Sequence, residues 1–491
     1  MNTKMIRYIL CRMLGVESVL LMIPVIVAAL YQEMSGIAFL IPAGILLLLF
    51  FLAGVKKPEQ SHIYGKEGMV IVALAWILWS LFGAMPFTIS GFIPNYMDAF
   101  FETVSGFTTT GSSILRDVEA LPQCLLFWRS LTHWIGGMGV LVFVLVLTSL
   151  DKKNSMYLMR AEVPGPEKDK LVPKAMSTAR ILYGMYLIMT VVEIIFLILT
   201  VIEMVFLVIG GMNLFDSMIF SFGSAGTGGF SNYADSVAHF HSAYIDGVIT
   251  TFCALFGVNF SLFYFMLLGD FKSVRKNEEL RTYIMLIVGA TALITLNIHS
   301  MFPSMIKAFR YAIFQVVTVI TTTGYATTDF AKWPMFSKSI LMMLTVVGAC
   351  ASSTGGGIKV SRLLVGIKCI KREIVQLAHP KSVGIIRIGG KKVGSDILRT
   401  IYIYFIAYVG ILIVSVMLVS LDNFDFETTF SAVLTTLGNV GPGMAKVGPM
   451  GNFADFSILS KLVLCFDMLA GRLEIFPFLV LFTAPAWRRK F

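Results

Sequence analysis

The chain has 491 residues, of which 57% are hydrophobic and only 14% are charged, and its formal net charge is +10. This composition excludes an ordinary soluble multidomain protein and describes a chain that is largely surrounded by lipid. The six cysteines are scattered, with no C-x-x-C pair and no metal-ligand spacing, so the sequence does not predict a disulfide framework.

Ten apolar stretches are long enough to cross a hydrocarbon core of about 30 Å. They lie near 7–30, 36–54, 67–91, 124–149, 181–211, 243–268, 281–302, 338–365, 399–420 and 457–485. If the first stretch starts inside, most of the 39 Lys and Arg residues fall on predicted cytoplasmic segments, as the positive-inside rule requires. We therefore predict that both termini are cytoplasmic and that the basic excess reflects topology, with no nucleic-acid partner.

Four segments between these stretches face outward and are too short or too polar to be spans. In each, a short amphipathic helix is predicted to precede a glycine-containing loop, and the glycines that align are Gly111, Gly229, Gly324 and Gly441. The repeated unit is helix, half-helix, loop and helix. Ordinary turns are the alternative, because Gly, Ser and Thr are common there, but the apolar half-helix in every segment argues against them.

The predicted fold class is an all-α integral membrane protein in which four pseudo-repeated units of helix, pore loop and helix surround one pore. Two extra transmembrane helices precede these units. The predicted division is an N-terminal two-helix extension followed by pore repeats 1 to 4, with boundaries at 1–55, 56–152, 153–270, 271–368 and 369–491.

The loop composition indicates a cation pore. Irregular backbone at membrane depth is tolerated only where it is buried in protein or lines a water-filled cavity. Glycine permits a positive φ, so successive carbonyls can point inward and replace the hydration shell of a cation, as in K⁺ filters. Threonine hydroxyls can hold the loops from behind or add an oxygen ligand. The predicted filter residues, and the only predicted metal-binding residues, are Thr109, Thr110, Gly111, Thr227, Gly228, Gly229, Thr322, Thr323, Gly324, Asn439, Val440 and Gly441.

Three segments resemble signatures of the TrkH branch of bacterial potassium transporters, whose superfamily includes KtrB and the plant HKT proteins. They are WRSLTHWIGGMG at 128–139, STGGGIK at 353–359 and MLAGRLEIF at 468–476. The resemblance covers almost the whole chain, and the two spans before residue 55 match the N-terminal pair that KtrB lacks. It implies K⁺ uptake across the bacterial inner membrane by a homodimer. It also implies a cytosolic TrkA-type ring of regulatory subunits, with nucleotide bound only to that partner and no covalently bound cofactor.

In that family, glycine at the aligned filter position of all four repeats goes with K⁺ preference, and serine in the first repeat marks Na⁺-preferring relatives. All four positions are glycine here. The second and fourth loops, at 226–229 and 438–441, depart from Thr-Thr-Gly, so the filter is predicted to be pseudo-symmetric. We expect K⁺ and Rb⁺ flux above Na⁺ flux, and a Na⁺-permeable relative is the alternative.

The span at 338–365 contains a run of small residues that weakens a helix at mid-membrane depth. The resemblance implies an intramembrane loop below the filter that moves aside for ions, and a site of close helix packing is the alternative. Arg472 matches the family arginine in the cavity below the filter. The alternative is a structural ion pair with an acid on a neighbouring helix or, less easily, with Asp467 or Glu474. The predicted gate residues are Gly348, Ser352, Ser353, Thr354, Gly355, Gly356, Gly357 and Arg472.

Two other polar features receive structural interpretations. Arg129 is intramembrane and is predicted to pair with Glu102 or Glu427 as part of the scaffold. His239 and His241 form an external H-x-H, which without further ligands indicates a solvated loop and not a metal site.

The main competing function is coupled transport of K⁺ with H⁺ or Na⁺. Coupling would need a relay of titratable groups along the path, and the acids within the spans form no obvious relay, which favours passive flow. The main acids are Glu17, Glu193, Glu203, Asp246, Asp467 and Glu474. No constellation of nucleophile, base and metal indicates an enzyme. The basic segments 150–180 and 366–398 are expected to contact either anionic lipid or the regulatory partner, and the resemblance favours the partner.

Overall fold

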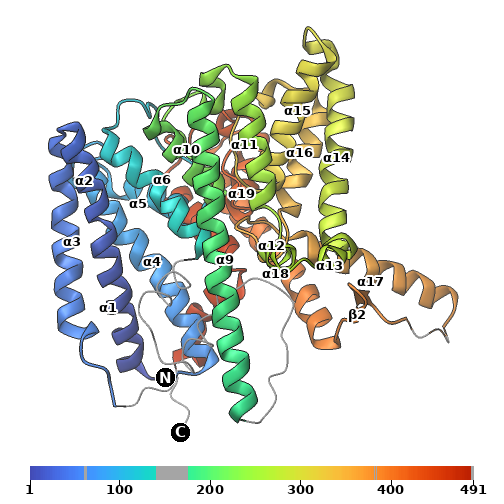
Figure 1. Cartoon of the computed structure of the whole chain (residues 1–491), viewed down its shortest axis with the longest axis horizontal. Coiled ribbons are helices and arrows are strands. Elements are labelled where there is room, and N and C mark those ends of the chain that lie inside the picture. Colours follow the sequence, from blue (N-terminus) through green and yellow to red (C-terminus); the bar gives the residue numbers. More distant parts are fainter. Residues whose placement is uncertain (60–62, 140–174, 381, 383, 488–491) are drawn as a thin grey trace.

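The computed structural model describes residues 1–59, 63–139, 175–380, 382 and 384–487. These residues are mostly helical (Figure 1), and the only strands among them are β1 (Arg387–Ile388) and β2 (Lys391–Lys392), which form one antiparallel hairpin. Six helices in the described ranges are long and apolar enough to cross a membrane, or seven if a bent pair is one span. The predicted all-α integral membrane fold is confirmed.

The N-terminal extension is a hairpin of two spans at one side of the molecule (Figure 1). The first span is α1 (Thr3–Leu20) with α2 (Met22–Tyr31), and the second is η1 (Met34–Gly36), α3 (Ile37–Leu49) and η2 (Phe50–Gly54). The turn between the spans uses the left-handed conformation of Gln32 (φ 57°). Both α1 and α3 pack on α4, so the extension buttresses the first repeat.

The rest of the chain repeats one order of elements four times: a long apolar helix, a short helix, an extended loop and a second helix. Repeat 1 contains α4 (Gly65–Ile89), α5 (Tyr96–Phe107) and α6 (Gln123–Met138). Repeat 2 contains α9 (Ala175–Ile209), α10 (Leu214–Gly226), η3 (Ser236–Phe240), α11 (Ala243–Phe256), α12 (Phe260–Leu267) and α13 (Phe271–Lys276).

Repeats 3 and 4 follow the same order. Repeat 3 contains α14 (Glu278–Ile298), η4 (His299–Met301), α15 (Met305–Ile320), η5 (Phe330–Lys332), α16 (Met335–Val347) and α17 (Val360–Ala378). Repeat 4 contains α18 (Ser395–Val419), η6 (Ser420–Asp422), α19 (Phe426–Leu437), η7 (Ala445–Val447), α20 (Ile458–Arg472), α21 (Phe476–Leu479), η8 (Val480–Phe482) and α22 (Ala484–Trp487). Helix α17 projects away from the bundle (Figure 1).

The repeats close into a ring. The second helix of each repeat packs against the short helix of the next one: α6 on α10, α11 on α15, α16 on α19, and α20 back on α5. Each short helix begins at a side-chain cap, which satisfies an otherwise unpaired backbone N–H. The capping residues are Asn95, Asn213, Ser304 and Asp425.

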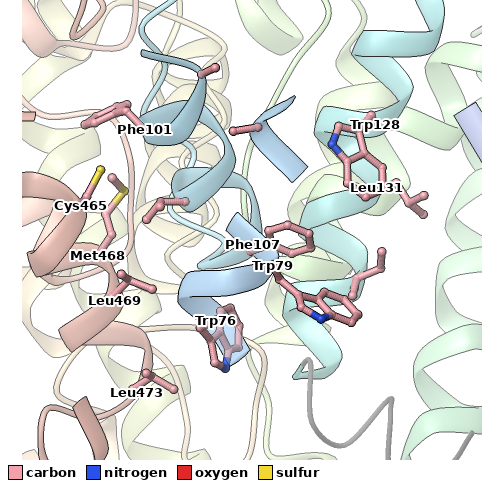
Figure 2. Packing of buried hydrophobic residues seen from close by; sticks show 14 of the residues in the cluster. Trp76, Trp79, Phe101, Phe107, Trp128, Leu131, Cys465, Met468, Leu469 and Leu473 are labelled. Atoms are coloured by element: carbon pink, nitrogen blue, oxygen red, sulfur yellow. The ribbon is translucent and has the colours of Figure 1, made fainter. Parts of the chain in front are cut away.

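A dense core joins the first repeat to the fourth (Figure 2). Trp76 and Trp79 of α4 and Trp128 of α6 are fully buried, and the Trp128 indole N–H donates to the carbonyl of Gly83 at 3.0 Å. Met468 and Leu469 of α20 belong to the same buried cluster. This packing fixes the side of the ring where the last repeat meets the first.

The second helices are interrupted more often than the sequence predicts. The stretch 243–268, predicted as one span, is bent by 91° between α11 and α12. The stretch 457–485 is broken after Arg472, where Glu474 (φ 53°) and Ile475 (φ 66°) both have a positive φ. Both predictions of a continuous helix are therefore wrong.

The interruption expected within 338–365 is present, between α16 and α17. In repeat 1, α6 ends at Met138 and Gly139 has a φ of 83°. Residues 140–149 of the predicted span at 124–149, and most of the predicted cytoplasmic segment at 150–180, lie outside the described residues.

Candidate functional site

The four aligned glycines lie in a closed ring of contacts. A β-carbon added to any one of them would overlap with the carbonyl oxygen that precedes the next glycine in the ring. The pairs are Gly111 with Gly228, Gly229 with Thr323, Gly324 with Val440, and Gly441 with Thr110. The four loops are therefore neighbours around one axis, in chain order, and each close approach requires a residue without a side chain.

The four loops share one backbone conformation. Each glycine has a positive φ between 73° and 94°, and so has the residue two positions earlier, with φ between 54° and 61°. Those earlier residues are Thr109, Thr227, Thr322 and Asn439. A positive φ is a genuine outlier for a β-branched residue such as threonine, so the surrounding contacts must hold these loops in place. Alternation between positive and negative φ turns successive carbonyls to the same side of a strand, the arrangement that a carbonyl-lined cation site needs.

The junction between short helix and loop is also the same in all four repeats. The residue before each glycine donates its N–H to the carbonyl five residues earlier, at 2.8–2.9 Å. The donors are Thr110, Gly228, Thr323 and Val440, and the acceptors are Ser105, Gly223, Thr318 and Thr435. The negative ends of four helix dipoles are consequently aimed at the ring, where they favour a cation over an anion.

Threonine hydroxyls brace the first and third loops from behind. Thr108 donates to the carbonyl of Val104 at 2.7 Å, and its hydroxyl lies 2.8 Å from that of Thr110. In repeat 3 the hydroxyl of Thr321 makes the equivalent bonds, to the carbonyl of Val317 at 2.7 Å and to Thr323 at 2.9 Å. The repeated bracing fixes the loops without using their backbone carbonyls.

The fourth loop uses an amide in place of these hydroxyls. The side-chain N–H₂ of Asn439 donates to the hydroxyl of Thr110 at 3.0 Å and to the carbonyl of Met468 at 2.9 Å. Asn439 thus joins loop 4 to loop 1 and to helix α20. The sequence marked this loop as a departure from Thr-Thr-Gly but gave no signal for the partners of its amide.

The glycine-rich segment between α16 and α17 lies directly against the ring. The N–H of Gly356 donates to the hydroxyl of Thr322 at 2.7 Å, and a β-carbon on Gly355 would lie 2.8 Å from the carbonyl of Thr321. Gly348 (φ 74°) and Gly357 (φ 75°) are in backbone contact with each other and close the segment into a loop. We call residues 348–359 the intramembrane loop.

Arg472 joins the intramembrane loop to the first repeat. Its guanidinium donates to the carbonyl of Thr354 at 2.6 Å and to the carbonyls of Gly136 and Gly137 at the end of α6. The two acids considered as ion-pair partners have other contacts: Asp467 accepts from Ser415 at 2.7 Å, and Glu474 pairs with Arg362.

A cavity of about 240 Å³ lies beside the intramembrane loop. Residues at the ends of α6 and α20 line it together with Ser352 to Gly357. Charges of both signs face it, from Glu193, Lys359, Arg472 and Glu474. The cavity therefore brings ionisable side chains into a mostly apolar space between two breaks in the second helices.

The buried pair Arg129–Glu102 confirms one of the two predicted partners. Their atoms Nε and Oε1 are 2.7 Å apart, and both side chains are almost fully buried. Glu102 also accepts from the backbone N–H of Ile114 at 2.9 Å, and Arg129 donates to the carbonyl of Ser231 at 2.9 Å. The pair thus fixes the segments that follow the glycines of loops 1 and 2. The other candidate, Glu427, pairs instead with Lys338.

The contacts of the external histidine His239 are with aromatic rings and one carboxylate. The His239 ring stacks on Tyr233 and lies 3.6 Å from an oxygen of Asp235. Across residues 1–59, 63–139, 175–380, 382 and 384–487, no group of three or more His, Cys, Asp or Glu side chains is arranged to hold a metal ion.

Glu279, at the start of α14, was not singled out from the sequence. Its carboxylate accepts from the backbone N–H groups of Ala351 at 2.6 Å and Ser361 at 3.2 Å. An acid in the first turn of a helix usually caps its own helix, so sequence alone gave no reason to connect it with the intramembrane loop.

Comparison with known proteins agrees with this geometry. The model of the TrkH family, described as a cation transport protein, matches residues 41–488. The chain is 35% identical to the Trk system potassium uptake protein TrkH of Escherichia coli K12 over 475 residues, which cover 95% of this chain and 96% of that protein. It is 30% identical to TrkG of the same strain, with 99% and 100% of the two chains covered.

The match extends to a solved structure. The crystal structure of the potassium transporter TrkH from Vibrio parahaemolyticus superposes with a TM-score of 0.85 at 31% identity, covering 99% of this chain and all of that one. A family match over most of the length, with relatives above 30% identity, fixes the assignment. This chain belongs to the TrkH family of cation transport proteins.

Proposed function

We propose that the chain is the membrane-embedded subunit of a potassium uptake system and that K⁺ passes through the ring formed by its four loops. The relatives named above are potassium uptake proteins. In our proposal the ion is substrate, and carbonyl oxygens of the filter residues replace its hydration shell. The proposed division of the chain keeps the five units inferred from the sequence, with the boundaries at 270/271 and 368/369 moved to the ends of α13 and α17.

The closed ring of glycine contacts is the observation that carries this proposal. Four loops of one conformation, each with a helix C-terminus behind it, supply oxygens and negative dipole ends around one axis. In loops 1 and 3 the hydroxyls of Thr108 and Thr321 bond to the preceding helix and to the next threonine but one, so this bracing does not occupy the loop carbonyls. Passive flow fits better than coupling, because buried acids such as Glu17, Glu203 and Asp467 belong to separate helices.

The intramembrane loop and Arg472 form the proposed gate. The loop contacts loop 3 of the ring through Gly356 and Thr322, so an ion that leaves the ring on this side meets it. Arg472 holds the loop through Thr354 and adds a positive charge beside the cavity. For ions to pass, the loop must leave these contacts.

The remaining expectations from the family resemblance are part of the proposal. The protein works as a homodimer in the bacterial inner membrane, with both termini in the cytoplasm. A cytosolic nucleotide-binding ring of the TrkA type regulates it. The basic face of α17, which projects from the bundle, suits either that partner or anionic lipid.

Growth at low K⁺ in bacteria that lack their own uptake systems tests the proposed function. We expect the chain to restore growth and Gly111→Ser to reduce K⁺ over Na⁺ preference, because a side chain at Gly111 would overlap with the carbonyl of Gly228. Gly91→Ser is the matched control: Gly91 has nearly the same φ (81° against 82°), but no atom lies within 4 Å of an added β-carbon. Failure to restore growth, or equal effects of the two variants, would contradict the proposal.

A further inference from the structure

One buried carboxylate binds the chain on both sides of the cavity-lining part of the intramembrane loop. Glu279 lies in the first turn of α14 and is only 8% exposed. Its Oε1 atom accepts from the N–H of Ala351 at 2.6 Å and from the N–H of Ser361 at 3.2 Å. These two residues lie on either side of Ser352 to Gly357, the part of the loop that lines the cavity.

The contact with Ser361 also completes a helix N-terminus. Helix α17 starts at Val360, and its N-cap residue, Lys359, makes no side-chain capping bond. The first N–H groups of a helix need an acceptor, and a carboxylate is favoured there by the helix dipole. Glu279 supplies that acceptor from another helix, so the start of α17 depends on where α14 lies.

The loop's other contacts combine backbone bonds with the side-chain bonds of Thr322 and Arg472 described above. Phe260 donates to the carbonyl of Ser352 at 3.1 Å, and Cys350 donates to the carbonyl of Gly257 at 3.1 Å, which docks the loop on the bend between α11 and α12. Lys359 is buried, donates to the carbonyl of Gly355 and is attracted electrostatically to Glu474 and, more weakly, to Glu279. Glu279 is therefore an anchor placed outside the loop, on a separate helix.

We infer that Glu279 is a positioning residue that sets the closed position of the intramembrane loop, an inference that rests on the proposed pore function. With the carboxylate present, the ends of the loop stay beside α14 and Gly356 stays against Thr322. Without it, two buried N–H groups lose their acceptor and are satisfied only if water reaches them or the loop moves. Removal of the carboxylate therefore favours the displaced loop and raises resting flux.

The chain supplies a matched control in the adjacent acid. Glu278 also belongs to the first turn of α14 and also contacts α17, through an ion pair with Lys368. That pair lies at the surface, with side chains 35% and 30% exposed, and it does not contact the loop. Glu278 variants therefore test loss of an acid and of an α14–α17 contact without loss of the anchor.

The experiment measures Rb⁺ uptake into vesicles that contain the purified full-length chain, without any regulatory subunit. We expect Glu279→Ala to raise resting flux by about tenfold, the change that follows from a shift of 1.4 kcal/mol in the loop equilibrium. Glu279→Gln, which keeps an acceptor oxygen, should raise it less, and Glu278→Ala should leave it within about twofold. Flux in Glu279→Ala equal to or below that of the parent chain, or an equal rise in Glu278→Ala, would overturn the inference.

A labelling measurement separates displacement of the loop from general damage. In chains carrying Ser353→Cys, a water-soluble thiol reagent added from the cytoplasmic side should react faster when Glu279→Ala is also present. The six natural cysteines are buried. Labelling of the parent chain and of Glu279→Ala, both without Ser353→Cys, measures how much these cysteines contribute to the labelling rate. An unchanged labelling rate would contradict the inference even if Glu279→Ala lowers protein yield. If the parent chain and Arg472→Ala both carry no Rb⁺, the proposed pore function itself fails.

Discussion

The Asn439 amide donates to the Thr110 hydroxyl at 3.0 Å, although 329 residues separate them. This bond joins the last loop of the ring to the first. The same amide also donates to the carbonyl of Met468 on α20, so it fixes the fourth loop to the helix behind it.

Asn439→Asp should reduce the preference for Rb⁺ over Na⁺. Aspartate has the same size, but it replaces a donor with an acceptor that faces the Met468 carbonyl, and an unmade buried hydrogen bond costs about 1–3 kcal/mol. We expect the Rb⁺ to Na⁺ flux ratio to fall by about tenfold. Asn452→Asp is the control. The side-chain oxygen of Asn452 accepts a hydrogen bond from the N–H of Ala454, and an aspartate oxygen can accept the same bond. An unchanged ratio in Asn439→Asp would remove this residue from the account of selectivity.

Gly229→Ala should abolish or strongly reduce K⁺ uptake. The added β-carbon would overlap with the carbonyl of Thr323, and φ at this position is 73°. Gly269→Ala introduces the same strain at φ 76° in a position where nothing lies within 4 Å. Uptake measured at equal protein levels should therefore separate the two variants. Similar uptake in both would show that backbone strain, and not contact within the ring, limits transport.

Glu102→Ala should destabilise the protein far more than loss of a surface ion pair. Breaking a buried pair by removing one partner costs about 3–5 kcal/mol, because the Arg129 charge stays buried. The comparison is Lys332→Ala, whose pair with Asp329 at 3.2 Å leaves the lysine 80% exposed and contributes about 1 kcal/mol or less. Thermal unfolding in detergent measures the difference. Equal melting temperatures for the two variants would contradict a scaffold role for Arg129 and Glu102.

Arg472→Ala should raise resting cation flux. The change removes the bonds to Thr354 and to the end of α6 and takes a positive charge away from the cavity. Resting Rb⁺ uptake into vesicles should rise by about tenfold if these bonds contribute about 1.4 kcal/mol to the closed state. Arg310→Ala, which removes an arginine paired with Asp246 instead, is the control. A fall in uptake with intact, correctly inserted protein would argue against a gating role.

The external cluster of Asp455 with Lys446 and Arg116 should make a pH-dependent contribution to stability. The hydrogen bond and the positive charge of Lys446 lower the pKa of Asp455, and the hydrogen bond and charge of Arg116 lower it further. A lowered folded-state pKa means that the stabilisation is present above the unfolded value of about 3.9 and is lost as pH falls through the folded value. The difference in melting temperature between the parent chain and Asp455→Asn should therefore be constant from pH 7 to about pH 5, shrink as pH falls below about 4, and disappear only below the lowered folded-state pKa. A difference that persists at the lowest pH would contradict this assignment.

Much of the fold follows from local sequence signals. The short helices are amphipathic, begin at good capping residues such as Asn95 and Asp425, and end a few residues before the aligned glycines, so their positions were predictable. The ring itself could be inferred only from the fourfold recurrence of that pattern. Its direct expression, the overlap between one glycine and the carbonyl of the next loop, depends on residues that are about a hundred positions apart or, for Gly441 and Thr110, much farther apart.

The break in repeat 3 was predicted from its run of small residues, but the breaks in repeats 2 and 4 could not be inferred in the same way. A single Gly257 does not end an apolar helix by itself. The backbone groups freed at the bend, the carbonyl of Gly257 and the N–H of Phe260, bond to Cys350 and Ser352 of another repeat. The partners of Glu279 are equally distant in sequence. Sequence patterns report local periodicity and composition, whereas these features depend on which segments meet after folding.

The glycine contacts run in one direction, since each loop leaves room for the carbonyl of the loop that follows it. The ring of loops therefore has a direction: each glycine contacts the following loop, and the contact is not reciprocated by that loop's own glycine. A change in one loop acts first on its successor and not equally on both neighbours. The Na⁺ flux caused by a single substitution should thus differ from loop to loop. The effects of two substitutions on Na⁺ flux should be less than additive in consecutive loops and closer to additive in loops on opposite sides of the ring.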